Sequence, residues 1–202
     1  MVYEGRVNAH IGPGLPIVQF EDLQLLLSVV RDRWPKDEVL FLLACDAGLR
    51  RCEILHADSR HVFLPDRLQV PVGKGGTSRY TVLTPRLRDC VSSFCRDHGR
   101  GPLCLYSYHS LREVLSRAVE ASGLDARVTW HGMRHYFATR LIDGGLPLHE
   151  VSGLLGHRWV HSTAYYLHVR SSRFLQASDV LSSPPFDPDR RPVFRILEGG
   201  AA

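Results

Sequence analysis

The feature that most constrains the fold is an apolar stretch, Val39-Leu-Phe-Leu-Leu-Ala-Cys45, which Gly48 follows closely. Seven apolar residues are too few to span a bilayer, because a transmembrane helix needs about 20. A helix that lacks a polar face is stable only when other elements surround it. The stretch therefore predicts a buried helix over residues 37–47 that ends at Gly48, and the sequence predicts no membrane segment.

The rest of the chain shows mostly helical periodicity, interrupted once by β-rich segments. Apolar or capping patterns predict further helices over residues 21–34, 51–56, 85–98, 110–122, 131–143, 148–155 and 162–169. Residues 62–63, 67–72 and 80–84 read as short strands, separated by Pro65-Asp66 and by Gly73-Lys74-Gly75-Gly76. The predicted fold class is mainly α (α+β), a helical domain with a small three-stranded antiparallel sheet.

Segments rich in helix-breaking residues flank this region and suggest the domain boundaries. Residues 1–19 contain several Gly and Pro and read as a linker or arm, and residues 182–202 read as a flexible tail. Residues 20–181 then form one domain, which is a usual domain size. Because residues 1–6 lack the basic and apolar regions of a secretory signal, we expect a cytoplasmic protein.

Composition adds weaker constraints. The net charge is +4 and the pI is about 8.9, which suits a polyanionic partner without identifying one. Only Lys36 and Lys74 among the 25 basic residues are lysines, so a lysine in a glycine turn stands out. The five cysteines lack CxxC spacing, which predicts buried free thiols.

The main chemical signal is His131-Gly-Met-Arg134-His135, followed by Leu-Leu-Gly-His157 and then Tyr166. Residues 131 and 134 share one side of a helix, so both can bind one anion, and a phosphate is the obvious candidate. A phenol near that phosphate can act as a nucleophile, which suggests covalent phosphoryl transfer. Each residue also has an ordinary interpretation: His157 can cap a helix, and a single tyrosine is most often part of a core.

Two other readings of the histidines matter. His131 and His135 have the spacing of two zinc ligands in a zincin helix, but Gly132 stands where that motif needs a glutamate, so we predict no metal. A histidine packed beneath the cleft is a better interpretation of His135 than direct catalysis.

Two earlier segments offer further basic groups. Arg50 follows Gly48, whose turn can project the arginine into a cleft while Glu53 holds it. Lys74 can enter a DNA groove, or protonate a leaving oxygen if its pKa is lowered. Taken alone, Arg50 suits a surface ion pair and Lys74 a solvated hairpin tip.

Together, Gly-Leu-Arg50-x-x-Glu53, Gly-Lys74-Gly, His131-x-x-Arg134-His135, Leu-Leu-Gly-His157 and Tyr166-Leu-His-Val resemble the tyrosine recombinase (phage integrase) family from about Leu15 to Val169. The resemblance implies that Arg50 and Arg134 clamp the scissile phosphate, with His131 and His157 as further donors. Lys74 would be the general acid, Tyr166 the nucleophile, and Glu53 and His135 supporting groups. The family spacing after His157 favours Tyr166 over Tyr165. No cofactor is implied.

The resemblance also implies partners and an architecture. The substrate would be double-stranded DNA, and four copies would assemble in synapsis, with a C-terminal segment such as residues 173–175 or 193–197 docked on a neighbour. Family members usually carry an N-terminal core-binding domain of roughly 100 residues, which we expect to be absent here. The alternatives are a type IB topoisomerase and a DNA-binding regulator that does not cut. The protein would be cytoplasmic and associated with the nucleoid when bound to DNA.

Overall fold

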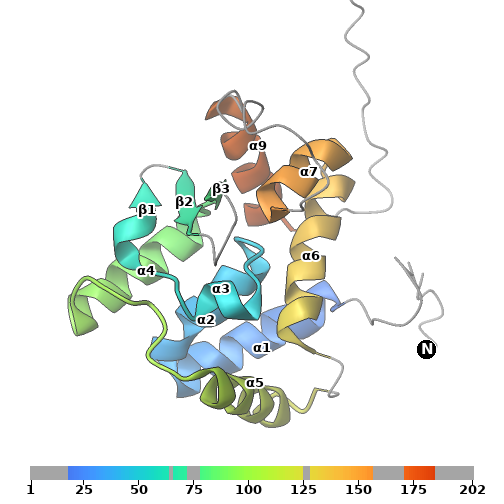
Figure 1. The fold of residues 1–202 in the computed structure, drawn as a ribbon. Coiled ribbons are helices and arrows are strands. Elements are labelled where there is room, and N and C mark those ends of the chain that lie inside the picture. Colours follow the sequence, from blue (N-terminus) through green and yellow to red (C-terminus); the bar gives the residue numbers. More distant parts are fainter. Residues whose placement is uncertain (1–17, 64–65, 72–77, 125–127, 157–170, 185–202) are drawn as a thin grey trace, which may run out of the picture.

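The computed structural model describes residues 18–63, 66–71, 78–124, 128–156 and 171–184 (Figure 1). Three of the predicted site residues, Lys74, His157 and Tyr166, lie outside these ranges, as does the helix predicted over residues 162–169. The predicted arm before residue 18 and the tail after residue 184 also lie outside them.

The described residues form helices around one small sheet. In chain order the elements are α1 (Phe20–Arg33), η1 (Pro35–Asp37), α2 (Glu38–Cys45), α3 (Arg51–Ile54), η2 (Ser59–His61), β1 (Val62–Phe63), β2 (Arg67–Val70), β3 (Arg79–Val82), α4 (Pro85–His98), α5 (Tyr108–Ala121), α6 (Trp130–Asp143), α7 (Leu148–Leu155) and α9 (Ser171–Ser182). The strands pair antiparallel in the order β1-β2-β3, with Leu68 opposite both Val62 and Thr81. The predicted class, mainly helical with a three-stranded antiparallel sheet, is confirmed.

Helix α2 lies in the middle of the main core. Every residue from Val39 to Cys45 is buried, as the unbroken apolar stretch predicts. Figure 1 shows α1, α4, α5 and α6 arranged around it, and the ring of Phe41 packs on that of Trp130 with centroids 5.0 Å apart. Because α2 cannot shift without exposing all of its apolar residues, it gives the turn that follows it a rigid base.

A second, smaller core joins β3, α6, α7 and α9. It contains Val82, Phe137, Leu155, Phe174 and Ala177, and Figure 1 shows α7 and α9 together at one end of the molecule. The sequence does not predict a helix at α9, and the resemblance makes residues 173–175 a candidate for docking on a neighbour. That assignment is wrong for Phe174, which is only 4% exposed and is part of the core of its own chain.

The cysteines differ in their exposure to solvent. Cys45 and Cys104 are buried, but Cys52 is exposed on the first turn of α3, so the prediction of a buried thiol is wrong there. None of the helices in the described parts of the chain combines the length and the apolar character needed to cross a membrane.

Candidate functional site

The site begins at the turn between α2 and α3. Gly48 has φ +65°, and a Cβ added to it would lie 2.5 Å from Cδ1 of Phe137, so both the backbone and the close approach of α6 require glycine. Arg50 is the N-cap residue of α3. Its backbone N–H donates to Oε2 of Glu53 at 2.7 Å, and its Nη1 donates to Oε1 at 3.0 Å. Glu53 therefore holds both the backbone and the side chain of Arg50, as the sequence analysis expected.

Arg79 on β3 binds the same carboxylate and was missed from the sequence. Its Nη1 and Nη2 donate to the two oxygens of Glu53 at 2.7 and 2.9 Å, and its Nε donates to the carbonyl of Leu154 at 2.8 Å. The side chain is 9% exposed. The available signal was strand alternation, because positions 79 and 81 share one face and Thr81 also points inward, to the carbonyl of Ala47 at 2.8 Å.

Arg134 approaches from the middle of α6. Its Nη1 donates to the carbonyl of Gly48 at 2.6 Å and lies 3.5 Å from Oε2 of Glu53, and its Nη2 donates to the carbonyl of Leu155 at 2.7 Å. The last carbonyls of a helix lack partners within the helix. Arg79 and Arg134 thus bind adjacent carbonyls, those of Leu154 and Leu155, at the end of α7.

Charge at this cluster is unbalanced. Three guanidinium groups around one carboxylate leave a net charge of +2. Burial alone would raise the pKa of Glu53, but the hydrogen bonds and charge of Arg79, the Arg50 N–H and the charge of Arg134 outweigh it and lower that pKa to about 2. Burial and the charge of Arg50 lower the pKa of Arg134 to about 9, so it still carries its charge at neutral pH. The cluster is therefore suited to binding an anion.

His131 and His135 form a pair on α6. Their Nε2 atoms are 2.8 Å apart, so one ring donates to the other, and the rings meet edge to face. His131 is exposed and His135 is half-buried. Although His131 is exposed, partial desolvation of its ring, followed by the charges of His135, Arg134 and Arg50, lowers its pKa below the usual 6.5. A neutral His131 can accept a proton near pH 7, and His135 is placed to support it.

A cavity of about 950 Å³ lies beside the cluster, between α3, α5 and the start of α6. Arg50 and His131 both line it, and the Arg50 side chain is 39% exposed, whereas those of Arg79 and Arg134 are buried. The guanidinium of Arg51 also lines the cavity and stacks 3.7 Å above the ring of Tyr108. Among the predicted residues that the structure describes, Arg50 and His131 are thus the ones that reach this open space.

The structure therefore brings together five of the eight predicted residues, Arg50, Glu53, His131, Arg134 and His135, from α3 and α6. The other three lie outside the described residues. Among the residues that the structure describes, no group of three or more His, Cys, Asp or Glu side chains is arranged to hold a metal ion.

Comparison with known proteins agrees with this fold and residue pattern. The helical domain with its small sheet has the fold of tyrosine recombinase catalytic domains. The catalytic domain of bacteriophage HP1 integrase superimposes with a TM-score of 0.57 at 22% identity, covering 82% of this chain and 95% of that one. The Tn1549 transposon integrase in complex with circular intermediate DNA superimposes with a TM-score of 0.62 at 16% identity, covering 78% and 62% of the two chains.

The sequence comparison then identifies the family. The profile of the Phage integrase family matches residues 17–173, so the chain belongs to that family. Tyrosine recombinase XerD of Lacticaseibacillus casei is 30% identical over 156 residues, which cover 69% of this chain and 53% of that protein. The chain thus spans about half the length of this curated relative.

Proposed function

We propose that the chain is the catalytic part of a site-specific DNA recombinase that cuts and rejoins DNA strands through a 3′-phosphotyrosyl intermediate. The observation that carries the proposal is the cluster of Arg50, Arg79 and Arg134 around Glu53, with a net charge of +2 beside a cavity that Arg50 and His131 line. Family membership and the order of the motifs support it.

The roles of the residues follow from phosphoryl-transfer chemistry. The phenolic oxygen of Tyr166 attacks the scissile phosphorus, the bond from phosphorus to the 5′ oxygen breaks, and a phosphotyrosyl bond forms. The phenol proton passes to an acceptor, for which His131 is the candidate, and Lys74 protonates the leaving 5′ oxygen. Arg50 and Arg134, together with His157, bind the oxygens over which charge spreads. The new ester keeps the energy of the phosphodiester, so a 5′-hydroxyl can reverse the step without a nucleotide cofactor.

The partner in this proposal is double-stranded DNA, and four copies of the protein would assemble in synapsis. We propose the same domain bounds as above: an arm over residues 1–19, a catalytic domain over residues 20–181 and a tail over residues 182–202. The setting would be the cytoplasm, at the nucleoid.

The test is a covalent-adduct assay. A pool of nicked duplexes of randomised sequence is incubated at low salt with wild-type protein, Tyr165→Phe or Tyr166→Phe, and adducts are resolved on a denaturing gel. We expect adducts with wild type and with Tyr165→Phe, and none with Tyr166→Phe. Binding without any adduct would overturn the proposal in favour of a regulator that does not cut, and relaxation of supercoiled DNA without strand exchange would favour the topoisomerase.

A further inference from the structure

The ion pair between Arg79 and Glu53 differs from two other partly buried ion pairs in the parts of the molecule that it connects. Arg86 pairs with the buried Asp46, and Arg117 pairs with the buried Asp37, and neither of these pairs includes a residue of the candidate site. Arg79 instead makes a bidentate contact with Glu53 and a third hydrogen bond with the carbonyl of Leu154. One guanidinium therefore joins β3, α3 and the end of α7.

Arg79 and its contact Leu154 also lie close in sequence to two predicted site residues, Lys74 and His157. Arg79 lies five residues after Lys74, and its Leu154 contact lies three residues before His157. Gly156, which ends α7 with φ +68°, packs so closely that an added Cβ would lie 2.7 Å from Cδ of Arg79. The close contact requires glycine next to His157 and keeps the Arg79 side chain against the point where the chain leaves α7.

The geometry at Glu53 gives Arg79 an indirect effect on Arg50. The oxygens of Glu53 that accept from Arg79 also accept from the backbone N–H and Nη1 of Arg50. With Arg79 removed, the carboxylate loses its two-point anchor and can rotate, so the accessible guanidinium of Arg50 loses its fixed direction.

We propose that Arg79 is a positioning residue: anchored by its hydrogen bond to the Leu154 carbonyl at the end of α7, it holds Glu53 and thereby fixes the direction of the Arg50 guanidinium. The Arg79 side chain is 9% exposed and that of Arg50 is 39% exposed, so Arg79 acts through these neighbours. This inference rests on the proposed recombinase function.

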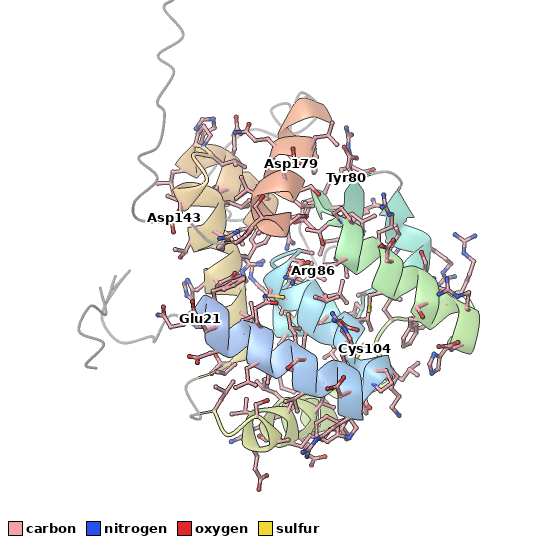
Figure 2. The ribbon with its side chains drawn as sticks, turned by 180° about the vertical axis from the view of Figure 1, so that it is seen from behind. Glu21, Tyr80, Arg86, Cys104, Asp143 and Asp179 are labelled. Carbon is pink, nitrogen blue, oxygen red and sulfur yellow. The ribbon has the colours of Figure 1, made fainter. Side chains whose placement is uncertain are left out.

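The test compares Arg79→Met and Arg79→Lys with Arg86→Met, a control that likewise removes an arginine partner from a carboxylate, that of the buried Asp46. Arg86 lies in the first turn of α4 and is labelled in Figure 2, where the molecule is seen from behind. We expect Arg79→Met to lower the adduct-forming rate at saturating DNA by about 10²-fold, because small displacements of catalytic groups cost that much. The DNA dissociation constant should change less than about threefold, since a buried arginine contributes little to the counterion release that drives DNA binding.

Arg79→Lys should recover only part of the rate, because one ammonium cannot make a bidentate contact and also reach the Leu154 carbonyl. Arg86→Met should lose stability but keep its rate. If Arg79→Met and Arg86→Met have the same rate at equal folded fractions, the inference is overturned.

A double-mutant cycle separates positioning from a general loss of stability. If Arg79 acts through Glu53, the double variant Arg79→Met/Glu53→Gln should form the adduct at a rate no lower than that of the slower single variant. Rates that fall by the product of the two single effects would contradict the proposal.

A measurement without DNA keeps the inference distinct from the proposed function. In carbon-13 NMR titrations, the carboxyl pKa of Glu53 should rise in Arg79→Met and stay unchanged in Arg86→Met, and the Arg50 Nε–H resonance should shift only in the former. If the wild-type protein forms no adduct, the recombinase proposal fails, but these spectra still test whether Arg79 holds Glu53 and Arg50 in place. Unchanged Glu53 and Arg50 signals in Arg79→Met would overturn it.

Discussion

At the residue scale, Glu53 keeps three like charges in one place. Its pKa of about 2 lies below the usual 4.5, so its charge stabilises the folded state above pH 4.5, and this contribution is lost as the pH falls from 4.5 towards 2. The difference corresponds to about 3 kcal/mol. We expect Glu53→Gln to lower the free energy of unfolding by that amount at pH 7, and the gap to wild type to close in acid. Urea unfolding from pH 7 to pH 3 measures it, and a gap that does not depend on pH would show that the carboxylate charge is unimportant.

His131 should set the acid limit of the reaction. Its pKa lies below 6.5 because burial and the charges of His135, Arg134 and Arg50 disfavour the imidazolium, so the ring stays neutral and able to accept a proton at pH 7. We expect the adduct-forming rate to be flat near pH 7 and to fall only below pH 6.5. His131→Ala should be slow and should lack this decline, whereas His98→Ala, at the end of α4, should keep it. A decline that persists in His131→Ala would assign the proton acceptor elsewhere.

At the element scale, local signals explain which helices could be predicted. The predicted bounds of α4 and α7 agree with the structure because Thr84 caps α4 ahead of Pro85 and Gly156 ends α7 in a left-handed conformation. The serine-rich α9 has no comparable signals. It is stabilised by packing on α6, where Arg140 donates to the carbonyls of Val180 and Ser183 at 2.6 and 2.5 Å.

The same contrast holds at the site. Arg50, Glu53, His131 and Arg134 could be found because they stand at recognisable distances within short motifs. Arg79 is not part of such a motif. Its place in the site depends on its contacts with Glu53 and Leu154, which lie 26 and 75 residues away in the chain. Contacts of that range depend on the packing of β3 against α3 and α7, which the local pattern of residues does not specify.

Helix α9 provides a prediction at this scale. Phe174 is 4% exposed and lies in the smaller core, so Phe174→Ala should destabilise the protein by about 3 to 5 kcal/mol. Leu175→Ala, one residue further on and 51% exposed, should change stability by less than about 0.5 kcal/mol. Chemical denaturation of both variants measures the difference. Equal, small effects would mean that α9 does not pack on its own chain in solution.

At the scale of the whole molecule, the charged cluster lies where the two cores meet. Helix α6 contributes Trp130 and Met133 to the main core and Phe137 and Leu141 to the smaller one, with Arg134 between them. Strand β3 likewise supplies Val82 to the smaller core and Arg79 to the cluster. Because both cores are closely packed, displacement of one relative to the other would change the distances among the arginines.

Arg50 allows the proposed DNA binding to be tested, because among the three arginines of the cluster it is the one that lines the cavity. Each phosphate contact that a cation makes contributes about 0.9 to the slope of log affinity against log salt concentration. We expect Arg50→Gln to weaken binding to all duplexes alike and to reduce that slope by about 1. The control is Arg31→Gln on α1, whose side chain is 60% exposed and pairs with Glu38. Fluorescence anisotropy at several salt concentrations measures both. A slope that Arg50→Gln leaves unchanged would show that this guanidinium does not contact a phosphate in the complex, and would contradict the proposed role of Arg50.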